Sequence, residues 1–186
     1  MRKISVIICS YNQGTSIKNI IPMVSEYFFD EIIVVNNGST DRTYSILNEL
    51  NAFYDFKVIE LNENMGKGHA MAIGIENTDA EILIFIDTDL FNLQERHLVQ
   101  LIKPLYNEEA DIVFGQAEET IMDYKMTPFK SFDFERAFFK KDILPILNDL
   151  KLSKFKVDTL LDFYCLYYKK RVKYVMLEGL KQVPKT

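Results

Sequence analysis

Short apolar runs alternate along this chain with longer segments in which apolar residues recur every three or four positions. The short runs are typical of buried strands, and the second pattern is typical of helices with one buried face. The runs predict strands over 4–9, 31–35, 57–60, 111–115 and 172–177, and another that begins at 82 and ends before Asp87. Strands that alternate with helices predict an α/β domain.

The periodic segments predict the helices between these strands. In the first helix the residues expected to share one face are Ile17, Ile20, Ile21 and Val24, and Pro22 is expected to bend it. In the second, the residues expected to face inward are Tyr44, Leu47 and Leu50 or Ala52, after a cap at Ser39, Thr40 or Asp41. A third helix is expected to end near 75, and others to cover 94–106, 132–150 and 158–169.

Three of the strands end in polar segments, which read CSYNQG, NNGSTD and DTD. The carboxyl ends of parallel strands meet at one edge of a sheet, so these segments are expected to share a crevice. Asp87 and Asp89 repel each other there unless a cation lies beside them. Carboxylate oxygens favour Mg²⁺ or Mn²⁺, so the pair predicts a metal site. The alternative is that Asp87 caps the turn while Asp89 points to water.

The segment MGKGHA opens the third predicted helix with two glycines and a lysine. Exposed backbone N–H groups, the helix dipole and Lys67 together suit an anion such as a diphosphate. The alternative is a glycine-rich turn with a solvated lysine. His69 and His97 have no second histidine nearby, and neither is predicted to bind a metal.

Composition narrows the classes of protein and of partner. With 186 residues and 48% hydrophobic content, the chain is expected to form one domain, and a net charge of -5 argues against nucleic acid as a partner. Cys9 and Cys165 follow neither a metal-ligand nor a disulfide spacing, which favours a reducing, cytoplasmic compartment. No apolar run is long enough to span a membrane, so membrane contact is expected only at the surface of the bilayer.

Four motifs carry a specific resemblance: ISVIICSYNQG, EIIVVNNGSTDRT, NENMGKGHAMAIGI and ILIFIDTDL. In order and separation they resemble glycosyltransferase family 2, especially the small bacterial enzymes of cell-envelope polysaccharide and glycolipid synthesis. The resemblance implies the GT-A fold, a Rossmann-like α/β fold whose mixed, mostly parallel sheet is flanked by helices. It also implies inverting transfer of a sugar from a nucleotide-diphosphate donor to a hydroxyl acceptor. Residues 1–115 would bind the nucleotide, and 116–186 would lie on the acceptor side of one domain, 1–186.

The resemblance assigns roles to individual residues. Ser10 and Tyr11 would lie under the nucleotide, Lys67 would touch the donor, Asp87 would approach the ribose and the metal, and Asp89 would ligate Mn²⁺ or Mg²⁺. Asn36 and Asn37 stand where the family usually has two aspartates that read the base and ribose. An amide keeps hydrogen-bonding capacity but loses the charge, so donor preference between UDP and GDP types stays open.

The second half supplies the remaining candidates. Asp158 is the candidate general base that takes the proton of the acceptor hydroxyl, with an N-cap as its alternative and Asp162 as a weaker candidate. Gln182 follows the last strand, either as a metal ligand or in a free tail. Arg136 is expected to meet an acceptor phosphate or to form a structural ion pair.

An aromatic cluster comprises Phe129, Phe132, Phe134, Phe138 and Phe139, beside Lys130, Lys140 and Lys141. Its helical spacing favours the core, and its density together with Lys169, Lys170, Arg171 and Lys173 also suits a surface on lipid headgroups. The acceptor is expected to be a carbohydrate or a lipid-linked molecule. The surface would fit a lipid-linked acceptor at the inner face of the membrane, and it allows a homodimer. Two other classes stay open: a catalytically silent scaffold, and a nucleotidyltransferase, although CSYNQGTS lacks the basic residue that such an enzyme carries after its first strand.

Overall fold

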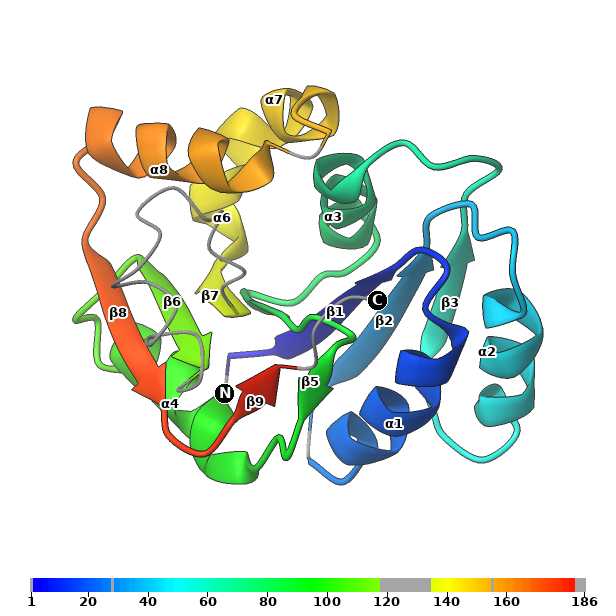
Figure 1. Ribbon diagram of the computed structural model, residues 1–186. Coiled ribbons are helices and arrows are strands. Elements are labelled where there is room, and N and C mark those ends of the chain that lie inside the picture. Colours follow the sequence, from blue (N-terminus) through cyan, green and yellow to red (C-terminus); the bar gives the residue numbers. More distant parts are fainter. Residues whose placement is uncertain (1, 28, 118–134, 155, 183–186) are drawn as a thin grey trace, which may run out of the picture.

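The computed structural model describes residues 2–27, 29–117, 135–154 and 156–182 (Figure 1). In chain order the elements are β1 (Ile4–Ser10), α1 (Gly14–Ser25), β2 (Glu31–Asn36), α2 (Thr43–Asn51), β3 (Lys57–Glu60), α3 (Lys67–Glu76), β4 (Ile82–Phe85), β5 (Leu90–Phe91), α4 (Glu95–Tyr106), β6 (Ile112–Ala117), β7 (Glu135–Phe139), α6 (Lys140–Ile143), the 3₁₀ helix η1 (Leu144–Ile146), α7 (Leu147–Leu152), α8 (Val157–Tyr167), β8 (Val172–Leu177) and β9 (Lys181–Gln182).

Seven of the described strands form one mixed sheet in the order β3-β2-β1-β4-β7-β6-β8. Only β7 runs antiparallel to its neighbours in it, and the remaining pairs are parallel. The carboxyl ends of β1, β2 and β4 therefore share one edge with the start of β7. The predicted α/β class with a mostly parallel sheet is confirmed.

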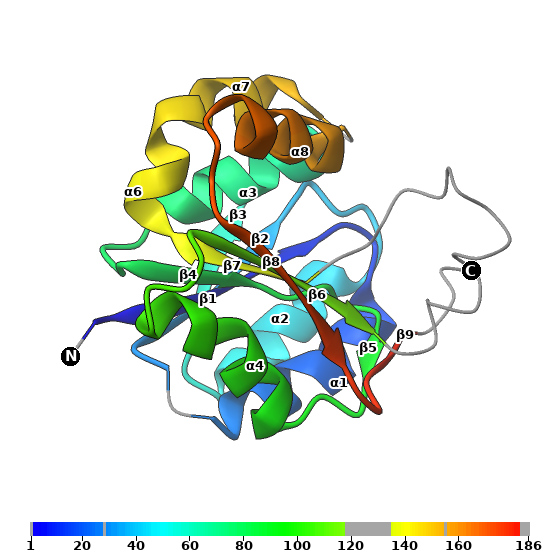
Figure 2. The same cartoon turned by 90° about the vertical axis from the view of Figure 1, so that its left-hand side faces the viewer.

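Helices cover both faces of the sheet (Figures 1 and 2). Successive strand residues point to opposite faces, so Val6 and Ile8 join one core while Ile7 joins the other. The first core is completed by α1, α2 and α4, and the second by α3, α6, α7 and α8. Two apolar layers therefore hold the polar strand ends in place.

The strand predictions are confirmed within two residues, whereas two helix predictions need correction. In α2 the buried residues are Thr43, Ile46 and Leu47, and Tyr44 is exposed because it lies beside this face and not on it. The single helix expected over 132–150 is wrong for 135–139, and from Lys140 onward it is divided into α6, η1 and α7. Residues 135–139 form β7, where cross-strand pairing with β4 and β6 overrides the helical spacing of the aromatic residues.

Two further sequence predictions concern the chain's end and the membrane. Of the two alternatives for Gln182, the free tail is wrong, because β9 pairs antiparallel with β5, with Leu90 opposite Gln182. Within the described residues, no helix has both the length and the apolar character needed to cross a bilayer. Phe129, Phe132, Phe134 and Lys130 lie outside the described residues, and Phe138 and Phe139 are buried, as their core assignment requires.

Candidate nucleotide and metal site

A cavity of about 190 Å³ lies at the carboxyl ends of β1, β2 and β4. It is lined by Cys9, Ser10, Tyr11, Gln13, Asn37, Asn64, Lys67, Asp87, Thr88 and Asp89. The structure therefore brings together six of the predicted site residues. Asn36 and Asp158 do not line this cavity.

The two aspartates after β4 face different partners, which reduces their mutual repulsion. The Nζ atom of Lys67 lies 2.9 Å from the Asp87 carboxylate. The side-chain amide of Gln182 donates to Oδ2 of Asp89 at 3.2 Å, and Asp89 is only 5% exposed. The turn after β4 thus holds one carboxylate against a cation and the other against an amide donor that β9 supplies.

These carboxylates fit a divalent cation of the Mg²⁺ type. Such ions bind through one or two carboxylates and complete their coordination with water and substrate phosphates. Among the described residues no group of three or more His, Cys, Asp or Glu side chains could hold a metal by itself. The donor set suits a cation that arrives with a diphosphate, as Asp87 and Asp89 line a cavity that also contains Lys67.

The side chain of Asn36 makes its hydrogen bonds within the protein. Its Nδ2 donates to Oε2 of Glu60 at 2.8 Å, and its Oδ1 accepts from the Ser39 hydroxyl. Burial raises the pKa of the Glu60 carboxyl. An aspartate at position 36 could not donate to Glu60, so the asparagine is explained by its neighbour on β3.

Asn37 lines the cavity, but both ends of its amide already have protein partners. Its Nδ2 donates to Asn64 at 3.0 Å, and its Oδ1 accepts from the backbone N–H of Met65 at 3.1 Å. These contacts fix the loop before α3 against the end of β2. Asn37 therefore shapes the wall of the cavity that Lys67 also lines.

The start of α3 differs from the anion cradle expected of its glycines. The Gly66 N–H donates to Oδ1 of Asn64 at 3.0 Å, and the Gly68 N–H donates to the Lys154 carbonyl at 2.8 Å. The expectation of exposed N–H groups at these two positions was wrong, because α3 packs end-on against the chain after α7. Lys67 alone carries this segment's positive charge into the cavity.

Glu135 is a site residue that sequence reasoning missed. It opens β7, is buried, and its Oε2 accepts the backbone N–H of Asp87 at 3.0 Å. Burial, followed by the charge of Asp87, raises its pKa well above the usual range. The signal was a charged pair, Glu135 and Arg136, at the head of an apolar run, which in a strand sends the two side chains to opposite faces.

Arg136 connects the sheet to the candidate base. Its guanidinium is fully buried, and Nη2 forms an ion pair with Oδ1 of Asp158. Its Nε and Nη1 have no hydrogen-bond partner among the described residues. Asp158 lies in the first turn of α8 and makes no side-chain cap bond, because Lys156 occupies the N-cap position. The ion-pair alternative for Arg136 is confirmed, and the N-cap alternative for Asp158 is wrong.

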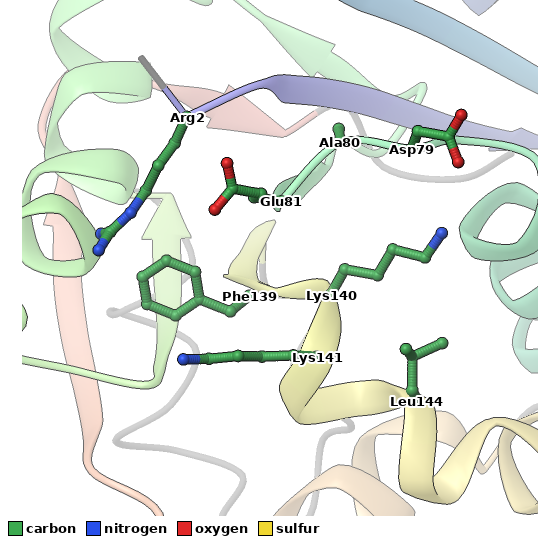
Figure 3. A pocket seen from close by; sticks show the side chains of 8 residues that line it. All are labelled: Arg2, Asp79, Ala80, Glu81, Phe139, Lys140, Lys141 and Leu144. Atoms are coloured by element: carbon green, nitrogen blue, oxygen red, sulfur yellow. The ribbon is translucent and has the colours of Figure 1, made fainter.

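A second cavity, of about 340 Å³, lies at the opposite edge of the sheet between Arg2, Glu81 and α6 (Figure 3). Its cations are already engaged: Arg2 pairs with Glu108 at 3.1 Å, and Lys140 donates to the Thr78 carbonyl. Arg2 and Lys141 also lie about 5 Å from the centre of the Phe139 ring. These contacts secure the start of β1 and the end of β7.

Comparison with known proteins matches this chain to glycosyltransferases. The family model described as glycosyl transferase family 2 matches residues 5–170. A poly-beta-1,6-N-acetyl-D-glucosamine synthase of Staphylococcus epidermidis is 34% identical over 88 residues, which cover 46% of this chain and 21% of that protein. A UDP-N-acetylglucosamine–dolichyl-phosphate N-acetylglucosaminyltransferase of Methanococcus voltae is 28% identical over 141 residues, 67% of this chain and 56% of that protein. The chain thus spans well under two thirds of either relative.

Among solved structures, glucosyl-3-phosphoglycerate synthase of Mycobacterium tuberculosis, in complex with Mn²⁺, UDP-glucose and glycerol 3-phosphate, matches with a TM-score of 0.75. The match covers 100% of this chain and 73% of that one at 20% identity, and it shows the shared GT-A fold. The family model covers nearly all of the 186 residues, and the chain therefore belongs to glycosyl transferase family 2.

Proposed function

We propose that this chain is the catalytic domain of a metal-dependent, inverting glycosyltransferase. It would move a sugar from a UDP- or GDP-type donor to a hydroxyl of a carbohydrate or lipid-linked acceptor in cell-envelope polysaccharide or glycolipid synthesis. The observation that carries the proposal is the cavity in which Lys67, Asp87 and Asp89 lie beside the ends of β1 and β2. The names of the two relatives, a polysaccharide synthase and a dolichyl-phosphate transferase, support the acceptor classes.

The residues divide into a donor side and an acceptor side. Asp87 and Asp89 would hold Mn²⁺ or Mg²⁺, and a bound cation would neutralise charge on the departing nucleoside diphosphate. Lys67 adds a second positive charge at that place, and the half-exposed ring of Tyr11 offers a face for the nucleobase. Residues 1–115 would form this donor side, and 116–186 the acceptor side.

Asp158 would accept the acceptor's proton. As the acceptor oxygen bonds to the anomeric carbon, the bond from that carbon to the diphosphate oxygen breaks, and the proton passes to the carboxylate. Arg136 holds Asp158 from inside the sheet. Because Glu135 and Arg136 are consecutive in β7, one strand supports both the turn of Asp87 and the candidate base.

The metal and nucleotide roles are tested by calorimetric titration with UDP, GDP and CDP, each with and without Mn²⁺. We expect one nucleotide to bind only when Mn²⁺ is present, and Asp89→Ala to abolish that binding while circular dichroism stays unchanged. Asp79→Ala is the matched control, since this exposed aspartate precedes β4 at the other end of the strand. Binding of none of the nucleotides would favour the silent scaffold. Unchanged binding in Asp89→Ala would show that Asp89 does not hold the metal and only accepts the hydrogen bond from Gln182.

The role of Asp158 is tested by Asp158→Asn, which keeps an oxygen acceptor for Arg136. Loss of a general base lowers turnover by roughly 10² to 10⁴-fold. Nucleotide binding should be unaffected, because Asp158 does not line the cavity. Turnover close to that of the unmodified chain would show that another group takes the proton.

A further inference from the structure

The helix α8 presents an apolar face to solvent. Phe163, Leu166 and Tyr167 are 67%, 77% and 80% exposed, and their spacing of three and four residues places them on one side of the helix. The other side packs Leu161, Tyr164 and Cys165 into the core. An aromatic ring, a leucine and a tyrosine exposed side by side form a patch of the kind that marks interaction surfaces.

The position of this face in the molecule leaves it accessible. α7 and α8 lie side by side at one end of the molecule, in the helical layer that also contains α3 and α6 (Figures 1 and 2). α8 therefore lies at the periphery of the molecule, where its exposed side chains suit a broad, flat partner rather than a small ligand. Neither cavity described above includes any of its three side chains.

Charge around α8 is opposite in sign to that of the chain as a whole. The segment 151–173 contains seven Lys and Arg residues and two aspartates, although the net charge of the chain is -5. Four of the seven cations pair with carboxylates elsewhere: Lys151, Lys170, Arg171 and Lys173. Within the described residues, Lys154, Lys156 and Lys169 make no ion pair and are exposed. They flank the two ends of α8, and Asp162 is the exposed carboxylate on the helix itself.

We infer that the face formed by Phe163, Leu166 and Tyr167 docks on an anionic membrane surface. Tyrosine and phenylalanine side chains settle at the level of lipid headgroups, where an apolar body and a polar tip are both accommodated. Lysines near an anionic leaflet add an attraction that falls with salt, and their aliphatic stems can lie along the apolar surface. The charge of Lys154, Lys156 and Lys169 is complementary to such lipids. In a two-fold dimer through the same face, these lysines of both copies would meet and repel each other.

The docking would also orient the proposed enzyme. Asp158 opens the same helix, so a membrane against α8 would adjoin the acceptor side. This orientation alone rests on the proposed function. Membrane binding itself requires no turnover, so the two proposals can fail separately.

The test is flotation of the chain with vesicles of phosphatidylcholine containing phosphatidylglycerol, against vesicles of phosphatidylcholine alone. We expect co-flotation with the anionic vesicles at low salt and its loss at high salt. The variant Phe163→Ser/Leu166→Ser/Tyr167→Ser should weaken binding at least about tenfold, because each side chain loses apolar burial. Phe53→Ser is the matched control, since Phe53 is 82% exposed and lies after α2 in the opposite layer.

A second pair of variants separates charge from apolar burial. Lys156→Glu/Lys169→Glu should weaken binding to anionic vesicles by at least about 20-fold, as each cation near such a surface contributes. Lys18→Glu/Lys103→Glu, at exposed positions of α1 and α4, changes the net charge equally and should bind as the unmodified chain does. No co-flotation at low salt, or equal loss in test and control variants, would overturn the inference. A dimer in light scattering that the triple serine variant dissociates, without vesicle binding, would assign the face to a second copy.

Discussion

At the scale of single residues, the effect of a substitution at Asn36 depends on Glu60, a partner that is distant in the sequence but in contact in the fold. Asn36→Asp would place a carboxylate where the amide now donates to Glu60 at 2.8 Å, replacing a hydrogen bond by repulsion between like charges. We expect a loss of about 2 kcal/mol in the free energy of unfolding at neutral pH, measured by urea denaturation. The loss should shrink as the pH falls and the carboxyls take up protons.

The control for this prediction is the second partner. Glu60→Gln in the Asn36→Asp background restores a donor opposite a carboxylate, and it should recover most of the lost stability. Glu60→Gln alone should change stability little, because an amide oxygen still accepts from Asn36. If the double variant were no more stable than Asn36→Asp, the stability lost in Asn36→Asp would come from a contact other than the one with Glu60.

Glu135 gives a prediction about pH. Its pKa is raised in the folded chain from the ordinary 4.5, so the folded state holds a proton that the unfolded state has already released. Its contribution to stability is therefore complete below about pH 4.5 and declines as the pH rises towards the folded pKa. Glu135→Gln mimics the protonated form and should remove that decline.

The measurement is the free energy of unfolding by urea across pH 5 to 8. The advantage of Glu135→Gln over the unmodified chain should grow with pH, whereas Glu135→Leu should be destabilised by about 1–3 kcal/mol at every pH because the Asp87 N–H loses its acceptor. A constant difference between Glu135→Gln and the unmodified chain would show that Glu135 is ionised in the fold.

At the scale of elements, apolar runs located the parallel strands because a buried strand needs little besides such a run. The sequence pattern did not predict β7 and β9, because both strands depend on their pairing partners. β7 depends on pairing with β4 and β6, and the aromatic spacing that suggested a helix carries no information on those partners. β9 has two residues and is defined by its contact with β5. The aspartates and Lys67 could be placed in one site from their motifs, while Glu135 required β7.

The packing of α3 on α7 explains a glycine that the sequence suggested for anion binding. A Cβ added at Gly68 would lie 2.4 Å from the Leu150 carbonyl oxygen and 2.1 Å from Oγ of Ser153. Gly68→Ala should therefore push the helices apart and lower the free energy of unfolding by about 1–3 kcal/mol, measured by urea denaturation. Lys67 precedes this contact, so Mn²⁺-dependent nucleotide affinity should fall as well.

Ser153→Gly separates the effects of the two groups that a Cβ at Gly68 would approach, the Ser153 hydroxyl and the Leu150 carbonyl. It removes the hydroxyl but leaves the Leu150 carbonyl, so it should rescue Gly68→Ala only in part. Full rescue would mean that the Ser153 side chain alone requires the glycine, and an undiminished stability of Gly68→Ala would mean that the two helices can separate freely.

At the scale of the whole molecule, the two cores share one sheet, so the nucleotide cavity and α8 should be coupled through global stability. The two thiols can measure this coupling, because each is protected from reagents in the folded chain. Burial raises the pKa of Cys9 to about 12 and that of Cys165 to about 11. At pH 8 Cys165 should react with a thiol reagent on the order of 100-fold more slowly than in urea, and Cys9 on the order of 1,000-fold more slowly, since the thiolate is the reactive form.

A bound ligand should slow labelling further at both positions. Mn²⁺ with the binding nucleotide at about 100 times its Kd stabilises the folded state by about 2.7 kcal/mol, which corresponds to roughly 100-fold slower labelling through global unfolding. Cys9 lines the cavity, so the decisive reading comes from Cys9→Ala, in which only Cys165 on α8 can react. Protection of Cys165 that Asp89→Ala abolishes would show that the metal site stabilises both layers. Protection confined to Cys9 would show simple shielding by the ligand, with α8 opening independently of the donor side.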